Sequence, residues 1–396
     1  MRSLRADFSF SAVVAGFVAV LVGYSSSVAL IFQAAQAVGA TPAHMVSWLW
    51  ALGLGMGLTS IALSWCYRQP VLTAWSTPGA ALIAATSGVT LAQATGAFVV
   101  CAVLLLLAGA TRAFERLMSR IPLSLAAALL AGVLARFALD AVLAARSAPL
   151  LVGVMVVAYL LGRRWWPRYA VPGVLAAGIA CALAQRAAGA YGTPPPPPGV
   201  EWAWAVPVWT PPQFDWPVLL GLALPLFVVT MVSQNLPGVA AQRASGYDTP
   251  VSPPVAVTGA ASLLLAPFGG YALNLAAITA AICMGREAHE DPARRYVAAM
   301  MAGAFYVVLG LGAGAVVSLL AAFPRELVLA VAGLALLSTI GTALAQAMQD
   351  PSQREPALLT FVVTLSGLQF AGIGSAFWGV LAGVIAMAVQ HWRARR

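Results

Sequence analysis

Fourteen long apolar runs, separated by short polar connections, constrain the fold of this 396-residue chain more than any other feature. About 20 consecutive apolar residues suffice for a helix to cross the hydrocarbon core of a bilayer. Charged residues make up only 8% of the chain, about a third of the ~25% usual in soluble domains. The sequence therefore predicts an all-α polytopic membrane protein with about 14 transmembrane segments. The runs cover residues 11–37, 43–65, 71–87, 92–111, 119–143, 147–162, 170–188, 216–238, 251–267, 270–285, 295–321, 325–347, 355–369 and 371–391.

The distribution of arginine indicates how the chain is oriented. All 21 basic residues are arginines, scattered in small groups between the runs. With the N-terminus in the cytoplasm, 17 of them lie on the cytoplasmic side, and only Arg146, Arg186 and Arg325 lie in the opposite loops. The positive-inside rule therefore predicts that both termini are cytoplasmic and that the first run is retained as a span. Such scatter is not typical of a nucleic-acid-binding patch, so no nucleic-acid partner is expected.

The number of runs indicates an internal repeat. Fourteen spans divide into two sets of seven, and because seven is odd, the second set crosses the membrane in the opposite sense. The halves share weak features: Gln33 and then Thr41-Pro42 in the first half, Gln234-Asn235 and then Thr249-Pro250 in the second. The long Pro- and Trp-rich connection at 189–217 is expected to link the halves outside the cell. We therefore expect a 7+7 inverted repeat.

The third and tenth runs are too short and too interrupted for ordinary spans. Residues 70–79 (PVLTAWSTPG) and 266–275 (APFGGYALNL) each precede a short apolar stretch. This pattern is typical of an extended segment followed by a half-helix, whose free N–H groups carry a partial positive charge. Alternatively, Pro78 and Gly269-Gly270 merely kink continuous helices. The matching positions of the two interruptions favour half-helices, and two such starts facing each other form an anion site.

These strings, together with residues 233–238 (SQNLPG) and 374–379 (GSAFWG), resemble those of the BenE-type benzoate transporters. The resemblance covers essentially the whole chain and implies a fold similar to that of the uracil permease and sulfate permease transporters. It also implies proton-coupled uptake of benzoate or a related aromatic carboxylate across a bacterial inner membrane, by movement of a core domain against a gate domain. Related folds commonly form homodimers. The implied parts are residues 1–115 (core, spans 1–4), 116–190 (gate, spans 5–7), 191–215 (external linker), 216–322 (core, spans 8–11) and 323–396 (gate, spans 12–14).

The expected substrate site surrounds the starts of the half-helices. Backbone N–H groups and hydroxyls would bind the carboxylate, and aromatic side chains would contact the ring. Uracil-permease relatives place carboxylates where our alignment puts Gln234 and Asn274, and a neutral site suits an anionic substrate. Ser25–Ser27 fit helix packing equally well, and Gln33 favours an interhelical hydrogen bond. The candidates are Tyr24, Ser25, Ser26, Gln33, Ser76, Thr77, Gly79, Gln234, Asn235, Phe268, Gly269, Gly270, Tyr271 and Asn274.

Proton coupling has no obvious carrier in this sequence. Proton relays in membranes usually use Asp, Glu or His, and none lies in the middle of a run. Asp140, Asp215 and Asp248, near the ends of runs, and the substrate carboxylate are the remaining candidates. Arg136 and Asp140 share a helical face, so they either neutralise each other or take part in gating or proton passage.

Two other classes of function are alternatives to a secondary transporter. A membrane-embedded enzyme that acts on pyrophosphate needs clustered carboxylates to hold a metal, and no run contains two acids. The four cysteines also lack the spacing of a metal site. We therefore expect neither catalysis nor a cofactor. An anion exchanger or a passive anion channel on the same fold needs no proton carrier and stays open as the alternative.

Overall fold

The helices of the structure follow the apolar runs of the sequence. The computed structural model describes residues 7–111, 123–166, 170–187, 204–286, 288–321, 323–368, 370 and 375–394. The first two runs form α2 (Phe10–Ala37) and α3 (Pro42–Tyr67). The other long helices are α5 (Leu91–Ala110), α7 (Leu123–Leu143), α8 (Pro149–Trp165), α9 (Ala170–Ala187), α13 (Ser252–Leu265), α15 (Tyr296–Leu311), α16 (Ala313–Ala321), α17 (Arg325–Ala347), α18 (Arg354–Ser366) and α19 (Ser375–Ala394).

Several of these helices have the length and apolar character of membrane spans. Among the described residues, six helices meet both requirements, and the bent helix α2 is a seventh when its two arms count as one span. The arms of α2, Phe10–Tyr24 and Ser27–Ala37, meet at 41°. The count of fourteen spans stays a prediction. Residues 188–203, most of the expected external linker, lie outside the described part of the chain.

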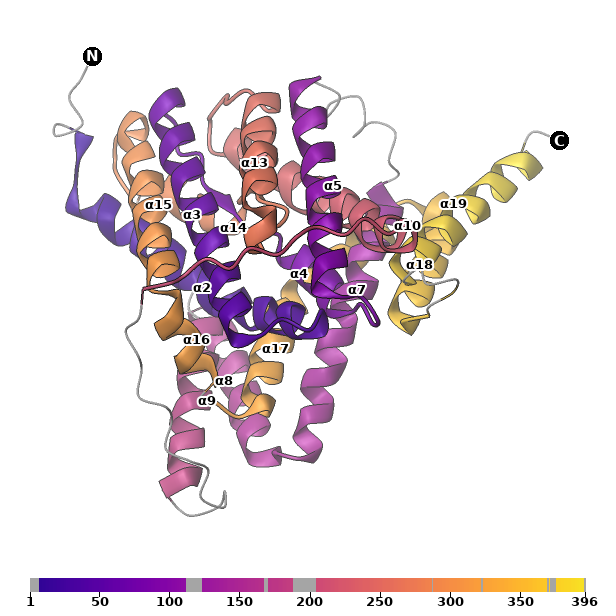
Figure 1. Ribbon diagram of the computed structural model, residues 1–396, viewed down its shortest axis with the longest axis horizontal. Coiled ribbons are helices and arrows are strands. Elements are labelled where there is room, and N and C mark those ends of the chain that lie inside the picture. Colours follow the sequence, from indigo (N-terminus) through magenta and orange to yellow (C-terminus); the bar gives the residue numbers. More distant parts are fainter. Residues whose placement is uncertain are drawn as a thin grey trace.

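One group of helices packs closely around α2 and α3. Helix α15 lies along both of them, and α13 lies along α5 and α3. Figure 1 shows α3, α5, α13 and α15 side by side in its upper part. A Cβ atom on Gly53 of α3 would lie 2.6 Å from the Cα of Gly310 in α15. Small residues thus let these two helices approach to backbone contact, as is common between membrane helices.

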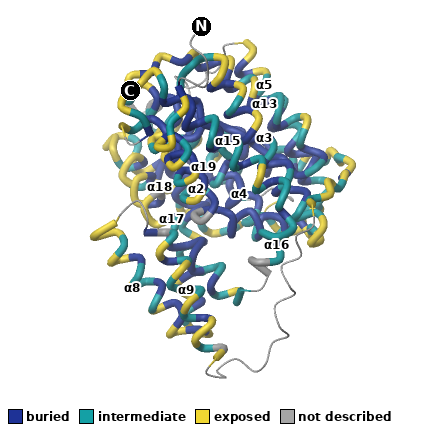
Figure 2. The backbone as a smooth tube through the Cα atoms, turned by 90° about the vertical axis from the view of Figure 1, so that its left-hand side faces the viewer, coloured by how far each residue is buried: buried dark blue, intermediate teal, exposed yellow. Residues whose placement is uncertain are grey.

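A second group of helices lies beside the first. Helix α7 packs on α17 and α18, α18 packs on α19, and α8 packs on α9 and α17. In Figure 1 the lower ends of α7 and α17 extend with α8 and α9 beyond the first group, while α18 and α19 lie at the side. Figure 2 shows buried residues concentrated in the first group and many exposed residues along α8 and α9. The exposed positions are largely apolar, for example Leu150, Val157 and Leu160, as expected of helices that face lipid.

The third and tenth runs are each divided into an extended segment and a short helix. Strand β1 (Thr73–Ala74) precedes α4 (Thr77–Ala84), and strand β2 (Asn274–Leu275) precedes α14 (Ile278–Met284). The strands pair antiparallel, with Thr73 opposite Leu275. The pairing brings the starts of the two short helices together in the interior of the first group. The structure agrees with the interpretation of half-helices rather than of kinked continuous helices.

Side chains of neighbouring helices complete the hydrogen bonding of this irregular backbone. Ser60 accepts a bond of 2.9 Å from the N–H of Thr73. Ser262 accepts a bond of the same length from the N–H of Leu273. Non-helical backbone at membrane depth requires such internal partners because lipid supplies none. The polar residues of α3 and α13 therefore hold the two extended segments.

The segment that opens the second half of the chain is a helix with two π-helical turns. It comprises α10 (Trp216–Val218), the π-helical η3 (Leu219–Ala223), α11 (Leu224–Thr230), the π-helical η4 (Met231–Asn235) and α12 (Leu236–Ala244). π-Helical turns are rare and occur frequently at functional sites. Turn η4 carries Gln234 and Asn235, two of the expected substrate ligands.

Candidate functional site

A large cavity lies where the two short helices begin. Its volume is about 1230 Å³, and its lining comes mainly from α2, α4, η4, α12, α14 and α15 on one side and from α7, α8 and α17 on the other. Buried Trp75 and Ser27 line its deep end. The space is ample for a small aromatic molecule, since ligand pockets typically measure about 300–1,000 Å³.

The polar groups at the deep end are uncharged. Thr77, the first residue of α4, and Thr279, in the first turn of α14, both line the cavity. Ser233 and Gln234 line it from the π-helical turn η4. Hydroxyls and an amide near helix starts can donate hydrogen bonds to a carboxylate without requiring a counter-charge.

Aromatic side chains form another part of the wall. Trp75 and Tyr306 both line the cavity. The ring of Tyr24 lies behind them, with its centroid 4.8 Å from that of Trp75 and 6.3 Å from that of Tyr306. The indole N–H of Trp75 donates a 2.8 Å hydrogen bond to Ser27. This bond fixes the orientation of an aromatic face that a flat substrate ring can contact.

Two of the expected substrate ligands, Ser76 and Gly79, instead form the N-terminal cap of α4. The Ser76 hydroxyl accepts hydrogen bonds from the N–H of Gly79, at 3.0 Å, and from the hydroxyl of Thr230, at 3.1 Å. Ser76 is fully buried. A Cβ on Gly79 would lie 2.6 Å from Leu226. Ser76 and Gly79 therefore shape the helix start, whereas Thr77 and Pro78 are the residues of this turn that line the cavity.

Two buried asparagines serve the backbone around β2. Asn235 accepts a 2.9 Å hydrogen bond from the N–H of Leu275. The Asn274 amide donates a 3.0 Å bond to the carbonyl of Ala272, and its side-chain oxygen has no partner among the described residues. Neither asparagine is part of the cavity lining.

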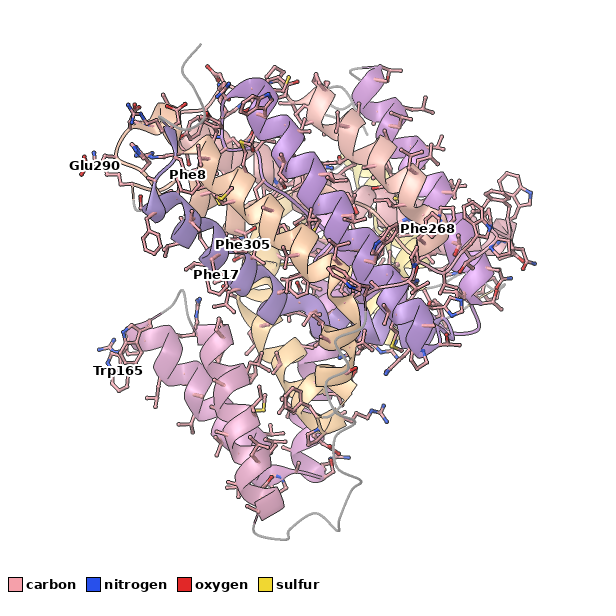
Figure 3. All side chains as sticks on the ribbon, turned by 60° about the vertical axis from the view of Figure 1, so that its left-hand side comes forward. Phe8, Phe17, Trp165, Phe268, Glu290 and Phe305 are labelled. Carbon is pink, nitrogen blue, oxygen red and sulfur yellow. The ribbon has the colours of Figure 1, made fainter. Side chains whose placement is uncertain are left out.

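The segment 268–271 does not reach the cavity. Phe268 packs edge-on against Trp50 and Trp209, with centroids 5.7 and 5.4 Å away. In Figure 3 it lies across the molecule from Trp165, which marks the end of α8. Tyr271 packs against Trp48 and Phe98 in the core.

The two glycines of this segment form a turn. Gly269 has φ +92° and follows the 3-10 turn η5 (Ala266–Phe268), where a Cβ would overlap the ring of Trp48. A Cβ on Gly270 would lie 2.5 Å from that of Leu265. Since α14 begins only at Ile278, these residues are remote from the helix start that the sequence associates them with.

The remaining candidates, which lie on α2, differ in their distance from the cavity. Tyr24 lies behind the aromatic wall, and its hydroxyl is buried without a hydrogen-bond partner among the described residues. Gln33 lies outside the cavity lining, and its side-chain nitrogen likewise has no partner among the described residues. The side chains of Ser25 and Ser26 lie outside the described part of the structure.

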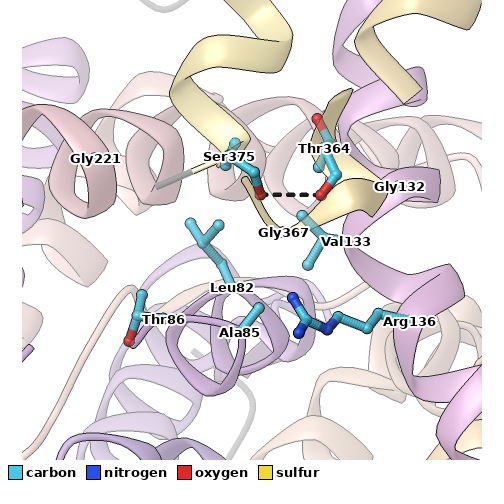
Figure 4. A pocket seen from close by; sticks show the side chains of 11 residues that line it. Leu82, Ala85, Thr86, Gly132, Val133, Arg136, Gly221, Thr364, Gly367 and Ser375 are labelled. Carbon is cyan, nitrogen blue, oxygen red and sulfur yellow. Dashed lines mark hydrogen bonds between the residues drawn. The ribbon is translucent and has the colours of Figure 1, made fainter. Parts of the chain in front are cut away.

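None of the expected proton carriers lines the cavity. Asp215 accepts a 3.3 Å hydrogen bond from Gln93, and Asp248 is exposed in the loop after α12. Asp140 is half-buried on α7, and among the described residues no ion pair joins it to Arg136. The Arg136 side chain instead lines a separate pocket of about 20 Å³ near Ala85, at the end of α4. Figure 4 shows this pocket, in which the Ser375 hydroxyl donates to the Thr364 carbonyl.

The lining residues that the sequence analysis did not identify include Trp75, Thr279 and Tyr306. Trp75 stands in the quoted string 70–79, beside Ser76, so the string itself contained the signal. Thr279 follows the second extended segment directly, and a search from the helix start would have reached it. Tyr306 lies in the middle of the apolar helix α15, where no local pattern separates it from a packing residue.

Known proteins match this chain over nearly its full length. A family model described as BenE, benzoate membrane transport protein, matches residues 6–389. The inner membrane protein YdcO of Escherichia coli K12 is 47% identical over 383 residues, which are 96% of either chain. A benzoate membrane transport protein of Acinetobacter baylyi is 42% identical over 387 residues, covering 98% of this chain and 96% of that protein.

A solved structure shares the fold. The transmembrane domain of a cyanobacterial bicarbonate transporter, BicA, superimposes with a TM-score of 0.64 at 15% identity, covering 95% of this chain and 97% of that one. At this identity the similarity shows the fold, which is that of a membrane transporter.

Proposed function

This chain belongs to the BenE family of benzoate membrane transport proteins, and from this premise we propose that it carries benzoate or a related aromatic carboxylate as a secondary transporter. The observation that supports this most is the cavity at the starts of α4 and α14, which combines neutral hydrogen-bond donors with aromatic walls. The matching family and the relative from Acinetobacter baylyi are named as membrane transport proteins, which agrees with the prediction of a transporter rather than an enzyme.

The proposed binding mode uses both parts of the wall. The carboxylate lies near the start of α4, with the Thr77 and Thr279 hydroxyls and the Gln234 amide as donors. The aromatic ring lies against Trp75 and Tyr306. Tyr24, Ser76, Asn235 and Asn274 support this site from behind, because each lies close to it while its side chain is buried among protein groups. A neutral site of this kind avoids the repulsion that a carboxylate in the wall would exert on the substrate.

The proposed transport movement is that of a core domain against a gate domain. The core comprises residues 1–115 and 216–322, the gate comprises 116–190 and 323–396, and residues 191–215 link them. Two features support this division: β1–α4 and β2–α14 repeat one motif in the two halves, and the cavity separates these elements from α7 and α17. The repeated motif also supports the 7+7 inverted repeat with fourteen spans. A homodimer stays a prediction.

The proposed orientation places both termini in the cytoplasm of a bacterial cell whose inner membrane holds the protein. The arginine distribution supports it. To test it, a single cysteine at position 196, in a variant without the four native cysteines, is treated with a membrane-impermeant maleimide in intact spheroplasts. We expect labelling without permeabilisation, with a cysteine at position 244, expected in the cytoplasm, as the unlabelled control. Labelling of position 196 only after permeabilisation would reverse the orientation.

Symport with protons is the proposed coupling, and Asp140 is the first carrier to test. One observation favours the second candidate, an anion exchanger or passive channel: no described lining residue of the cavity is an Asp, Glu or His. The two mechanisms differ in their energy source. A symporter concentrates its substrate when protons run down their gradient, whereas an exchanger requires an anion on the other side and a channel only equilibrates.

Uptake into proteoliposomes separates these mechanisms. With the membrane potential clamped, labelled benzoate should accumulate above equilibrium when the exterior is made acidic, and a protonophore should abolish the accumulation. Uptake that requires benzoate inside and ignores the pH gradient would establish exchange. If Asp140→Asn retains pH-driven accumulation, Asp140 is not the carrier. Absence of any benzoate flux through the wild type would contradict the proposed function itself.

A further inference from the structure

The cavity has an exposed end that differs in charge from its deep end. Arg163, in the last turn of α8, and Arg286, two residues after the end of α14, both line the cavity and are both exposed. Trp75 and Ser27, by contrast, are buried. The cavity therefore opens where the two arginines lie. Figure 3 shows Trp165, two residues beyond Arg163, at the tip of α8.

The charge at this opening is entirely positive among the described lining residues. Arg163 and Arg286 are its charged members, and no described lining residue is acidic. Among the described residues, no ion pair within 4.0 Å involves either arginine. Low-dielectric walls around a cleft of one sign focus its field and raise the local concentration of the opposite charge.

The position of the two arginines suits an effect on the rate of substrate association rather than on the rate of dissociation. They lie at the exposed end, whereas the neutral donors Thr77 and Gln234 lie near the helix starts. Charges at the edge of a binding site chiefly change the association rate and its salt dependence, while buried contacts set the dissociation rate.

Resting on the proposed function, we propose that Arg163 and Arg286 form an anion-collecting pair at the mouth of the cavity. By the proposed orientation both residues lie on the cytoplasmic side, so in the inward-open state the pair attracts carboxylates into the cavity from that side and favours them over neutral aromatic molecules of the same shape. The two residues come from opposite sides of the cavity: Arg163 from the helix that packs on α9 and α17, and Arg286 from the end of α14. The two arginines therefore flank the mouth only in the conformation in which the cavity is open on this side.

Stopped-flow fluorescence measures this effect directly, because Trp75 lines the cavity and should report benzoate binding. In the purified full-length protein at low ionic strength, the double variant Arg163→Gln/Arg286→Gln should bind benzoate about five- to tenfold more slowly than the wild type. Its dissociation rate should stay within about twofold. The difference should shrink as salt is added, since the Debye length falls to about 3 Å at 1 M. Arg163→Lys/Arg286→Lys keeps the charge and should keep the association rate.

A matched control distinguishes the effect of the local electric field at the mouth from the effect of the protein's net charge. Arg164→Gln/Arg243→Gln removes the same charge from exposed residues outside the cavity lining, and its association rate should equal that of the wild type. An equal loss in this control, or an unchanged association rate in the mouth variant, would overturn the inference while leaving the proposed function intact. A wild type without saturable benzoate binding would overturn the proposed function, and this inference with it.

Discussion

The side-chain oxygen of Asn235, on the π-helical turn η4, accepts a 2.9 Å hydrogen bond from the backbone N–H of Leu275 in β2. Both residues are buried, and the Asn235 amide nitrogen lies 3.4 Å from the sulfur of Met231. The bond ties the segment that presents Gln234 to the strand that leads into α14. Adjacent residues of one turn thus have different tasks: Asn235 holds two elements together, and Gln234 lines the cavity.

Asn235→Leu should lower the stability of the protein, because it leaves the buried N–H of Leu275 without a partner. Such a loss costs about 1–3 kcal/mol and should lower the midpoint of thermal unfolding, measured by fluorescence in detergent. Gln234→Leu is the matched control, since it should weaken benzoate binding with little change in that midpoint. Equal midpoints for Asn235→Leu and the wild type would show that the bond contributes nothing to stability.

Gln234→Glu should weaken benzoate binding at neutral pH. A carboxylate beside the bound anion at low dielectric costs several kcal/mol unless it is protonated. The bound anion raises the pKa of the new carboxyl group, so the protonated form, and with it the affinity, returns as the pH falls. Titration calorimetry at pH 7.5 and 5.5 measures this recovery, with Gln234→Leu as the variant that should show none. Unchanged affinity at neutral pH would place Gln234 outside the substrate site.

Trp75→Leu should reduce the preference for aromatic over saturated substrates. An aromatic face contributes about 0.5–1.5 kcal/mol to a ring contact beyond the burial of area. The affinity for benzoate should therefore fall by that amount relative to the affinity for cyclohexanecarboxylate, whereas Trp75→Phe should keep the preference. Competition against labelled benzoate gives both affinities. A constant ratio across the three proteins would exclude Trp75 from contact with the ring.

Gly269→Leu should damage folding rather than substrate recognition. The sequence makes Gly269 a candidate of the substrate site, and such a role predicts that a bulky residue there abolishes binding without unfolding the protein. In the structure, Gly269 has φ +92° and its Cβ would overlap Trp48, so strain and overpacking together should cost about 2 kcal/mol or more. The yield of monodisperse protein and the unfolding midpoint should fall. A well-folded variant that has lost only benzoate binding would restore the original interpretation.

The sequence by itself determined where the helices lie and where two of them are interrupted. A membrane helix is specified by the mean hydropathy of about 20 consecutive residues. The interruptions are specified by proline and glycine, which restrict or free the local backbone around Pro78 and Gly269. Both effects operate within a short stretch of chain. The extended segments before α4 and α14 were therefore predictable. The neutral side chain at position 234 was predictable too, because it follows directly from the residue type.

Only the tertiary structure decided which members of each string line the cavity. Thr77 lines it and Gly79 packs on Leu226; Gln234 lines it and Asn235 bonds to Leu275. Neighbouring residues on a helix point in directions about 100° apart, so a motif fixes their proximity but not which of them faces the substrate. Tyr306 comes from a helix distant in sequence. Its place in the wall depends on the packing of α15 against α2 and α3, which no local pattern in the sequence specifies.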